Sequence, residues 1–581
     1  MADRSVEEKS LDDTRKKGCL PAVCVLLALV VIRQLFSAGI PLFVRLSISD
    51  DVLMIRMAHG LINGDWLGDY YGVLLMKGCF FPMFLTAAKL VKVPYLQAVT
   101  LAHSAACVFF VSQVRSLIRD RRLLVMMAAV LLFDPCSFAK RSFQEVYRNS
   151  ISETQVLFIF GAIIGLYLNF GENRIKDLLK AAFAGFMMWG FWNTREDAIW
   201  MLPFFTVALA VIAISAICGR KSSRDLAAGI LILILPFVLL YGGNQWIKGN
   251  NLKYYGEKVR LECADGEFAG LMKTIYSVKP EADIPRVSVT AEKLERLYAV
   301  SPTLNRIRND LDERNSYYSN IDLRKEDGEV EDGFFLWSLR WAADQAGVAG
   351  SLPEAQRFYG QIRSEIETAL DTPGSGLERG KTMPSALMSP WKKEYAGQLI
   401  SKMKDGVFYI IRYKDVETTV EKSTESSAAD LFAEVTGNSY LREEDESSKG
   451  LASATSAVKR AAVVTRIYQI IDPLIFLAAA AVLIWLIILS IRRRTLQHGR
   501  LFLIIAGMWL SIVVMLCGVA YTDITAFPAV TYYYLAGAYP LMLAGECMIL
   551  FYSAEKRSEL FSGSSSAGKT EIKETEICSE K

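Results

Sequence analysis

Long apolar segments with almost no charge recur along the chain and are separated by polar segments. A membrane-spanning helix needs about 20 apolar residues, and most of these segments approach or exceed that length, although 123–133 is short. The segments are 20–44, 94–114, 123–133, 154–170, 178–192, 199–218, 226–246, 470–491, 501–521 and 531–552. This pattern predicts an all-α polytopic membrane protein with about ten transmembrane helices.

Two further segments follow the first apolar run and predict helices on the membrane surface. Residues 80–91 are apolar but too short to cross a bilayer, and they include Lys89. Along 50–63, apolar residues recur at the spacing of one helical face, with Ser49 as the N-cap and Gly64 as the stop. This face consists of Leu53, Met54, Met57, Ala58, Leu61 and Ile62. An amphipathic helix of this kind lies in the membrane surface.

The distribution of charge sets the expected orientation. Basic residues at 15–17 precede the first apolar run and place the N-terminus in the cytoplasm by the positive-inside rule. If 80–91 is not counted as a span, the arginine-rich segments 115–122 and 492–494 also fall in the cytoplasm, and the acidic motifs fall outside. We therefore expect a multi-pass protein of the cell membrane with both termini in the cytoplasm.

The polar and apolar segments divide the chain into parts. They are a cytoplasmic N-terminus at 1–19, a transmembrane module at 20–246 with a first external loop at 45–93, a mostly helical extracytoplasmic domain at 247–462, C-terminal transmembrane helices at 463–552, and a disordered cytoplasmic tail at 553–581. Helical spacing in the external domain predicts helices at 291–298, 333–345, 353–370 and 394–404. The aromatic segment 333–341 predicts a helix core, with a sugar-binding platform as the alternative. The Ser-, Glu- and Ala-rich segment 423–454 predicts a poorly ordered linker.

Composition supports a membrane protein and argues against several other classes. The chain has 581 residues, of which 52% are hydrophobic, and a mean hydropathy of +0.25. Its cysteines include no C-x-x-C pair and its three histidines are far apart, so neither a disulfide framework nor a histidine-based metal site is expected. A phosphate-loop pattern at 563–570 has no preceding strand and no room for a nucleotide-binding domain, so we interpret it as a coincidence.

The acidic pair Asp50 and Asp51 carries the first candidate chemistry. The two carboxylates follow the first apolar run and lie in the first turn of the predicted helix, where the helix dipole favours their ionised forms. A charged carboxylate at a lipid–water boundary is a candidate general base or metal ligand. The alternative is that the pair only caps the helix.

A second group of charged residues is expected on the same side of the membrane. Arg195, Glu196 and Asp197 come at a predicted outer boundary, and they form either a solvated turn with an internal ion pair or part of a substrate site. Arg148 and Lys77 add positive charge on this side, and arginine binds phosphate through paired hydrogen bonds. The loop 134–150 holds Arg141, Glu145 and Arg148, and its alternative interpretation is a positively charged external loop of no special role. We predict that these residues converge with the acidic pair to bind an anionic lipid head group.

The order of these parts resembles the GT-C superfamily of integral-membrane glycosyltransferases. The resemblance covers about 20–245 and rests on Ser49-Asp50-Asp51, on the loop Gly64-Asp65-Trp66-Leu67-Gly68-Asp69-Tyr70, and on Lys77-Gly78 and Pro82. The family places an acidic residue in a second functional loop, and Glu145 is the candidate for it here. The domain at 247–462 departs from the pattern, because it matches no known sugar-binding module.

The resemblance implies transfer of a sugar from a polyprenyl-phosphate-linked donor to a glycan, lipid or protein acceptor on the outer face of the membrane, with inversion. Asp50 or Asp51 would then be the general base, and Lys77, Arg148 and Arg195 would neutralise the leaving phosphate. Glu145, Glu196 and Asp197 would complete the substrate site. Some family members use a divalent metal such as Mg²⁺ or Mn²⁺, which these carboxylates could hold, but no cofactor is certain. Membrane lipid is an expected partner and nucleic acid is not.

Two alternatives belong to other classes of protein. A transporter or flippase for a lipid-linked glycan precursor would need ionisable residues deep within the spans, and these are sparse in the sequence apart from Arg33. A non-catalytic envelope scaffold would bind its partner through the domain at 247–462.

Overall fold

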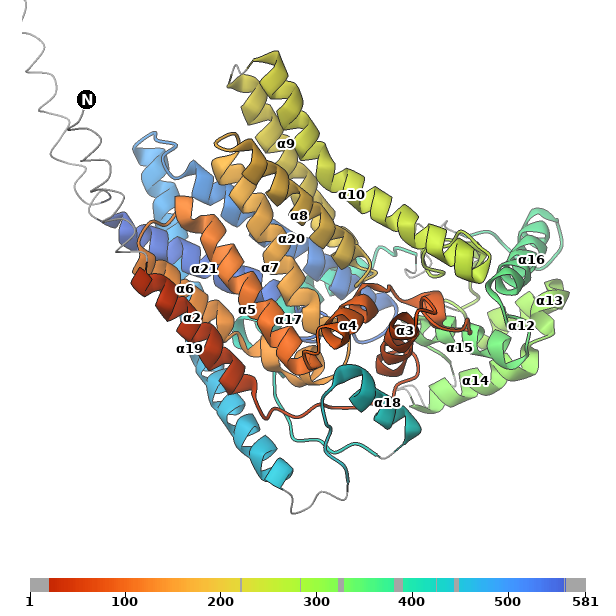
Figure 1. The fold of residues 1–581 in the computed structure, drawn as a ribbon. Helices are drawn as coiled ribbons and strands as arrows, with labels where there is room; N and C mark the ends of the chain where they lie inside the picture. The colour runs from red at the N-terminus through yellow and green to blue at the C-terminus, as the bar shows by residue number, and fades with distance from the viewer. Residues whose placement is uncertain are drawn as a thin grey trace, which may run out of the picture.

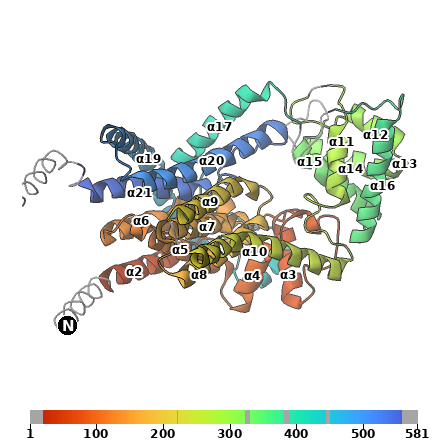
Figure 2. The ribbon, with the colours of Figure 1, turned by 90° about the horizontal axis from the view of Figure 1, so that it is seen from above.

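The computed structural model describes residues 20–219, 222–282, 284–321, 329–380, 390–424, 426–443, 449–557 and 560. Within these ranges all regular secondary structure is helical, with a few isolated bridges between extended segments. A long helical bundle carries a smaller group of helices at one end (Figures 1 and 2). The expectations for 1–19 and for the tail pattern at 563–570 lie outside the described residues.

Each segment predicted to span the membrane contains a helix of the bundle. The helices are α2 (Leu20–Ser37), α5 (Tyr95–Gln113), α6 (Arg121–Leu132), α7 (Asn149–Asn169), α8 (Arg174–Trp192), α9 (Leu202–Cys218), α10 (Ser223–Tyr255), α19 (Lys449–Arg492), α20 (Gly499–Thr525) and α21 (Ala538–Glu555). In the described part of the chain, six helical segments are long and apolar enough to cross a membrane: 95–116, 149–169, 198–218, 223–255, 449–492 and 499–525. The prediction of an all-helical, multi-pass membrane protein is therefore confirmed, whereas the count of ten spans stays a prediction.

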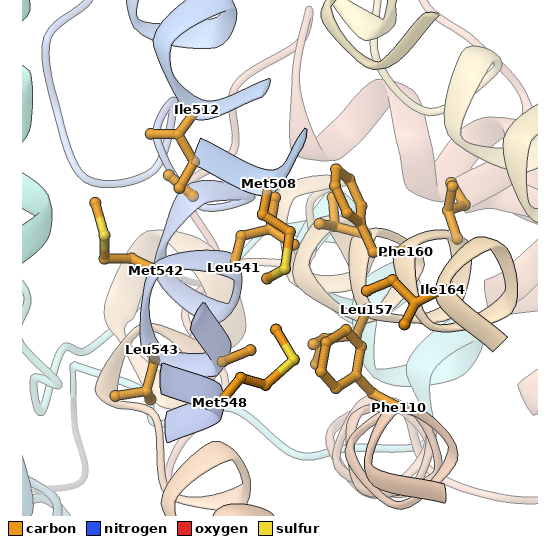
Figure 3. Close-up of a cluster of buried hydrophobic side chains, with 14 of the residues drawn as sticks. Phe110, Leu157, Phe160, Ile164, Met508, Ile512, Leu541, Met542, Leu543 and Met548 are labelled. Carbon is orange, nitrogen blue, oxygen red and sulfur yellow. The ribbon is translucent and has the colours of Figure 1, made fainter. Parts of the chain in front are cut away.

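The centre of the bundle is an apolar core to which helices from both ends of the chain contribute. Phe110 of α5, Phe160 of α7, Met508 of α20 and Met548 of α21 are all fully buried there, and Figure 3 shows them directed toward one another. On the outside of the bundle, large apolar side chains are exposed, such as Leu231 of α10 at 69%. An exposed apolar surface of this kind fits contact with lipid.

The smaller group of helices has a core of its own. It comprises α11 (Glu267–Ser277), α12 (Ala291–Val300), α13 (Pro302–Asn305), α14 (Arg308–Ile321), α15 (Asp332–Gln345) and α16 (Leu352–Asp371). Leu297, Leu339 and Tyr359 are completely buried among these helices. The helices predicted at 291–298, 333–345 and 353–370 are confirmed. The helix predicted at 394–404 extends to Arg412 as α17 (Tyr395–Arg412) and packs along α20 of the bundle (Figure 2).

Helix α3 (Asp51–Asn63) and helix α4 (Phe80–Leu90) lie between the bundle and the smaller group (Figure 1). The predicted apolar face of α3 is buried, but against α4 and α18 (Ser427–Thr436) instead of facing outward, and Ile55 on another face is buried as well. The expectation that this face lies in the membrane surface is therefore wrong, because other parts of the chain cover it. The cap is Asp50 and not Ser49, whereas the helix stops at Gly64 as predicted, with a left-handed φ of 85°.

The segment predicted as a poorly ordered linker, 423–454, contains α18 and the start of α19. Ala429, Phe432 and Val435 of α18 are at most 2% exposed and pack against α3 and α4. The prediction of a poorly ordered linker is therefore wrong for the described part of this segment. The polar composition of this segment suggested disorder, but the few apolar residues of α18 lie on one face and are enough to form a buried helix.

Residues 417–442 cross the end of the bundle and interlace with two earlier segments of the chain. Leu42 pairs with Tyr440 in a parallel bridge, and Phe43 pairs in the same way with Glu145. The side-chain amide of Gln144 donates to the Thr419 carbonyl at 2.8 Å and accepts from the Thr419 N–H at 2.9 Å. Two distant parts of the chain thereby fix the backbone that leads from α2 to Asp50.

The arginine-rich segments gather at the opposite end of the bundle. The backbone N–H of Arg119 donates to the Glu555 carboxylate at 2.8 Å, and Arg493 donates to the Leu560 carbonyl at 3.0 Å. The segments 115–122 and 492–494 therefore lie at the same end as the end of α21. That this end faces the cytoplasm stays a prediction.

Candidate functional site

Asp51 organises the loop before α3. Its buried carboxylate accepts the backbone N–H groups of Arg45 at 2.8 Å, Leu46 at 3.1 Å, Ser47 at 2.7 Å and Val52 at 3.0 Å. Burial raises the pKa of Asp51, and the backbone N–H groups oppose that rise. Because both oxygens are occupied by the backbone, Asp51 holds the loop in shape.

Asp50 is directed instead toward side chains of the site, and its side chain is 25% exposed. One carboxylate oxygen accepts a hydrogen bond from Lys77, and the other accepts from Arg45 at 3.3 Å and from the Ser47 hydroxyl at 3.1 Å. Burial acts to raise the pKa of Asp50, but the charges of Lys77, Arg45 and Arg148 outweigh it and hold the pKa well below its usual range. Asp50 is therefore ionised and is the more accessible of the two acids.

Lys77 connects Asp50 to the rest of the site. Its ammonium donates to Asp50 and to the Tyr147 hydroxyl, and it lies 4.8 Å from the centre of the Tyr147 ring and 5.4 Å from that of Trp337. Trp337 belongs to α15, so the smaller group of helices contributes directly to the site. The neighbouring Gly78 is packed so closely against Asn193 that a Cβ would lie 2.1 Å from its carbonyl oxygen. Only glycine allows this approach, which holds Lys77 beside the turn that follows α8.

Arg148 and Glu196 form the next link. Arg148 caps the start of α7, and one of its amino groups donates to both carboxylate oxygens of Glu196 and to the Thr194 carbonyl at 3.2 Å. Burial disfavours the charge on Arg148, but the adjacent Glu196 outweighs this and raises the pKa of Arg148. The Nε of Arg148 is buried and has no hydrogen-bond partner among the described residues.

Arg195 is fully engaged by protein groups. Its Nε and Nη2 donate to the two oxygens of Asp197, each at 2.8 Å, and its Nη1 donates to Asn149 at 2.9 Å. The guanidinium lies 6.0 Å from the centre of the Tyr534 ring. Burial opposes ionisation of Asp197, but Arg195 outweighs it and lowers the pKa of Asp197. The internal ion pair considered for this turn is present, and Arg195 forms part of the wall of the site.

Glu145 is a second acid close to Asp50. It is 2% exposed, and its oxygens lie 3.8 Å from an amino nitrogen of Arg45 and 3.5 Å from one of Arg141. Burial raises the pKa of Glu145 to about 7, although both arginines act to lower it. Arg45 contacts both Asp50 and Glu145, so the two carboxyl groups belong to one network.

The structure therefore brings all the predicted site residues to the same end of the bundle: Asp50, Asp51, Lys77, Glu145, Arg148, Arg195, Glu196 and Asp197. Sequence reasoning gave no role to Arg45, Arg141 or Tyr147. The available signal for Arg45 was a basic residue at the predicted outer end of the first span, where the other charged residues are acidic. The ring of Tyr533 lies 5.3 Å from the Arg141 guanidinium and adds an aromatic surface.

The carboxylates of the site do not fit a divalent metal. Asp51 accepts only backbone N–H groups, and the oxygens of Asp50 face two cationic side chains. No group of three His, Cys, Asp or Glu side chains in the described ranges is arranged to hold a metal ion. The donor set instead suits an anion, since the cations outnumber the free acceptors around Asp50.

No family model and no curated protein sequence matches this chain. The structure is similar to that of the archaeal oligosaccharyltransferase AglB from Archaeoglobus fulgidus, determined in complex with an inhibitory peptide and a dolichol-phosphate. The two proteins are 11% identical, the match covers 92% of this chain and 51% of AglB, and the TM-score is 0.37. The chain thus spans about half the length of AglB. A likeness this weak carries no conclusion about activity.

Proposed function

We propose that the protein is an integral-membrane glycosyltransferase that moves a sugar from a lipid-phosphate-linked donor to an acceptor hydroxyl. The observation that supports this most is the network around Asp50, in which an accessible carboxylate lies among Lys77, Arg45 and Arg148. Such a transfer requires cationic side chains that bind the donor phosphate and a general base close to them.

In this proposal the donor phosphate binds to Lys77 and Arg148. The free Nε of Arg148 offers a hydrogen bond at once, and Lys77 exchanges its bond with Asp50 for one with phosphate. Loss of that ion pair raises the proton affinity of Asp50, because the nearest positive charge is then shared with the phosphate. Donor binding thereby activates the base.

Asp50 then takes the proton of the acceptor hydroxyl as its oxygen bonds to the anomeric carbon. The bond from that carbon to the phosphate oxygen breaks, and the lipid phosphate leaves with the electron pair, its charge neutralised by Lys77 and Arg148. Attack from the face opposite the leaving group inverts the configuration at the anomeric carbon. In this proposal Glu145, which has a pKa of about 7 and shares Arg45 with Asp50, is the next acceptor of the proton.

The decisive experiment is the substitution Asp50→Asn in the full-length protein, assayed with polyprenyl-phosphate-linked sugars in detergent or lipid. Transfer should fall by ~10²–10⁴-fold, with insertion and unfolding temperature unchanged. The exposed Asp69→Asn in the same loop is the matched control and should retain activity. Wild-type transfer by Asp50→Asn would refute the proposed role.

One observation supports the alternative of transport. The expectation that ionisable residues are sparse within the spans is wrong, since Glu153, Asp472 and Glu546 are buried in α7, α19 and α21. A flippase would move a lipid-linked sugar across vesicles that contain the protein without forming a new glycosidic bond. Translocation without transfer in the assay above would favour this alternative.

A further inference from the structure

Beyond the candidate site, ionisable side chains are buried inside the helical bundle. They include Arg33, Asp134, Glu153, Asp472 and Glu546, none of which is more than 3% exposed. A charge buried away from water is costly unless an opposite charge or several hydrogen bonds compensate it. The single guanidinium of Arg33 can balance only one carboxylate, so the four acids cannot all be ionised.

Asp472 of α19 and Glu546 of α21 face each other where the two helices pack. Neither oxygen of Glu546, nor Oδ1 of Asp472, accepts a hydrogen bond from a donor in the described part of the chain. An ionised carboxylate can only accept hydrogen bonds. Two facing carboxyl groups can therefore bond to each other only when at least one of them carries a proton.

Asp134 and Glu153 form a second pair of the same kind. Asp134 accepts the Cys136 N–H at 3.0 Å with one oxygen, but its other oxygen and both oxygens of Glu153 have no such bond among the described residues. The two carboxyl groups interact with each other. Arg33 is near this pair, but its amino groups donate to Ser37 and, at 3.1 Å, to Ser137.

Tyr413 lies between the two pairs. It is 1% exposed and lies near enough to Asp134, Asp472 and Glu546 for their charges to act on its hydroxyl. A phenol both donates and accepts a hydrogen bond, so it can connect two protonated groups. The other titratable side chains around the pairs are Arg33, His103, Cys107, Cys136, Tyr468, Tyr539 and Cys547.

We propose that Asp134–Glu153 and Asp472–Glu546 are two proton-binding carboxyl pairs, connected through Tyr413, and that each pair holds at least one proton at neutral pH. The described residues contain no three-ligand group that would bind a metal ion in their place. The first pair also lies beside the candidate site, because Asp134 begins the segment that ends at Arg148, and Glu153 follows in the second turn of α7.

The direct test is infrared spectroscopy of the full-length protein at neutral pH, where a protonated carboxylic acid gives a carbonyl band that shifts in deuterated water. Asp472→Asn and Glu546→Gln keep the shape of each side chain but supply an amide donor, and each should remove part of this band. Glu153→Gln should remove a further part. The matched control is Glu394→Gln, which removes an exposed acid at the start of α17 and should leave the band unchanged.

A second measurement is the unfolding temperature as a function of pH. The folded protein holds protons that the unfolded chain releases at neutral pH, so stability should fall as pH rises. The double variant Asp472→Asn/Glu546→Gln should lose part of this dependence and remain folded, because its amides can pair. An unchanged band and unchanged pH dependence in the variants would overturn the proposal. Stabilisation of the wild type by Na⁺ that is lost in the double variant would also overturn it, since a cation and not a proton would then occupy the pair.

Discussion

The acids of the candidate site and those inside the bundle have the same chemistry but opposite surroundings. Asp50 and Asp197 face lysine or arginine, whereas Asp472 and Glu546 face each other. Asp50 and Asp197 are also partly exposed, at 25% and 41%, whereas Asp472 and Glu546 are at most 3% exposed. The nearest partner and the exposure to water together decide which acids keep their charge. Glu145 lies between these cases, because its two arginines are more distant at 3.5 and 3.8 Å.

The largest expected effect concerns the buried ion pair of Arg340 and Glu262, in which the acid has a cationic partner although no water reaches it. Both side chains are completely buried, and two hydrogen bonds of 2.8 Å join them, while Arg340 also donates to the Gly72 carbonyl of the first loop. Arg340→Met should cost about 3–5 kcal/mol of unfolding free energy, because it leaves Glu262 charged and unpaired.

This loss is measured by chemical unfolding in detergent. The double variant Arg340→Met/Glu262→Leu should recover part of it, since no charge is then buried alone. Lys279→Met, which breaks an exposed pair with Glu378, is the control and should leave the unfolding free energy nearly unchanged. Equal losses in the buried and exposed variants would show that the partner of a buried charge matters little here.

Lys77→Met removes the cation that keeps Asp50 ionised. Transfer should fall by ~10²–10³-fold, because the phosphate loses a positive charge at its binding position. Lys77→Arg should restore part of the activity. Lys176→Met, at the opposite end of the bundle, should have no effect on kcat, and equal activity in both methionine variants would separate Lys77 from the chemistry.

Asp51→Asn tests whether Asp51 stabilises the loop, as its hydrogen bonds indicate, and does not take part in the proposed reaction. The amide replaces one acceptor oxygen with a donor that faces backbone N–H groups, so the unfolding free energy should fall by about 1–3 kcal/mol. The exposed Asp65→Asn is the control for charge alone. An Asp51→Asn protein that is inactive but as stable as the wild type would mean that Asp51 has a chemical role.

Glu145 provides the smallest expected effect, a change in the pH dependence of stability. Its pKa rises from 4.5 to about 7 on folding, so its contribution is fully present below pH 4.5 and is lost as pH rises through about 7. The unfolding temperature of Glu145→Gln should therefore fall less across this window than that of the wild type. An identical slope in both proteins would contradict the buried setting of Glu145.

The helices could be predicted from the local pattern of apolar and polar residues. The predictions that were wrong, for the apolar face of α3 and for the linker, depended on packing between distant parts of the chain. The periodicity of 353–370 and the glycine after α3 were enough to define α16 and the end of α3. That α18 packs over the apolar face of α3 was not predictable, because the two helices are more than 350 residues apart in the sequence. Opposite charges in the first loop indicated a site, whereas the separate roles of Asp50 and Asp51 depend on which backbone N–H groups each carboxylate meets.

The interlacing of residues 41–45, 144–145 and 417–442 has a consequence for biosynthesis. The nascent chain can insert its first helices long before the partners of Leu42 and Gln144 emerge from the ribosome. The loop of Asp50 therefore cannot reach its final form until residue 442 has been translated and delivered to the same side of the membrane. A chain that stops earlier would place hydrophobic helices in the bilayer without completing the end that carries the candidate site, and quality-control proteases would meet it in that state.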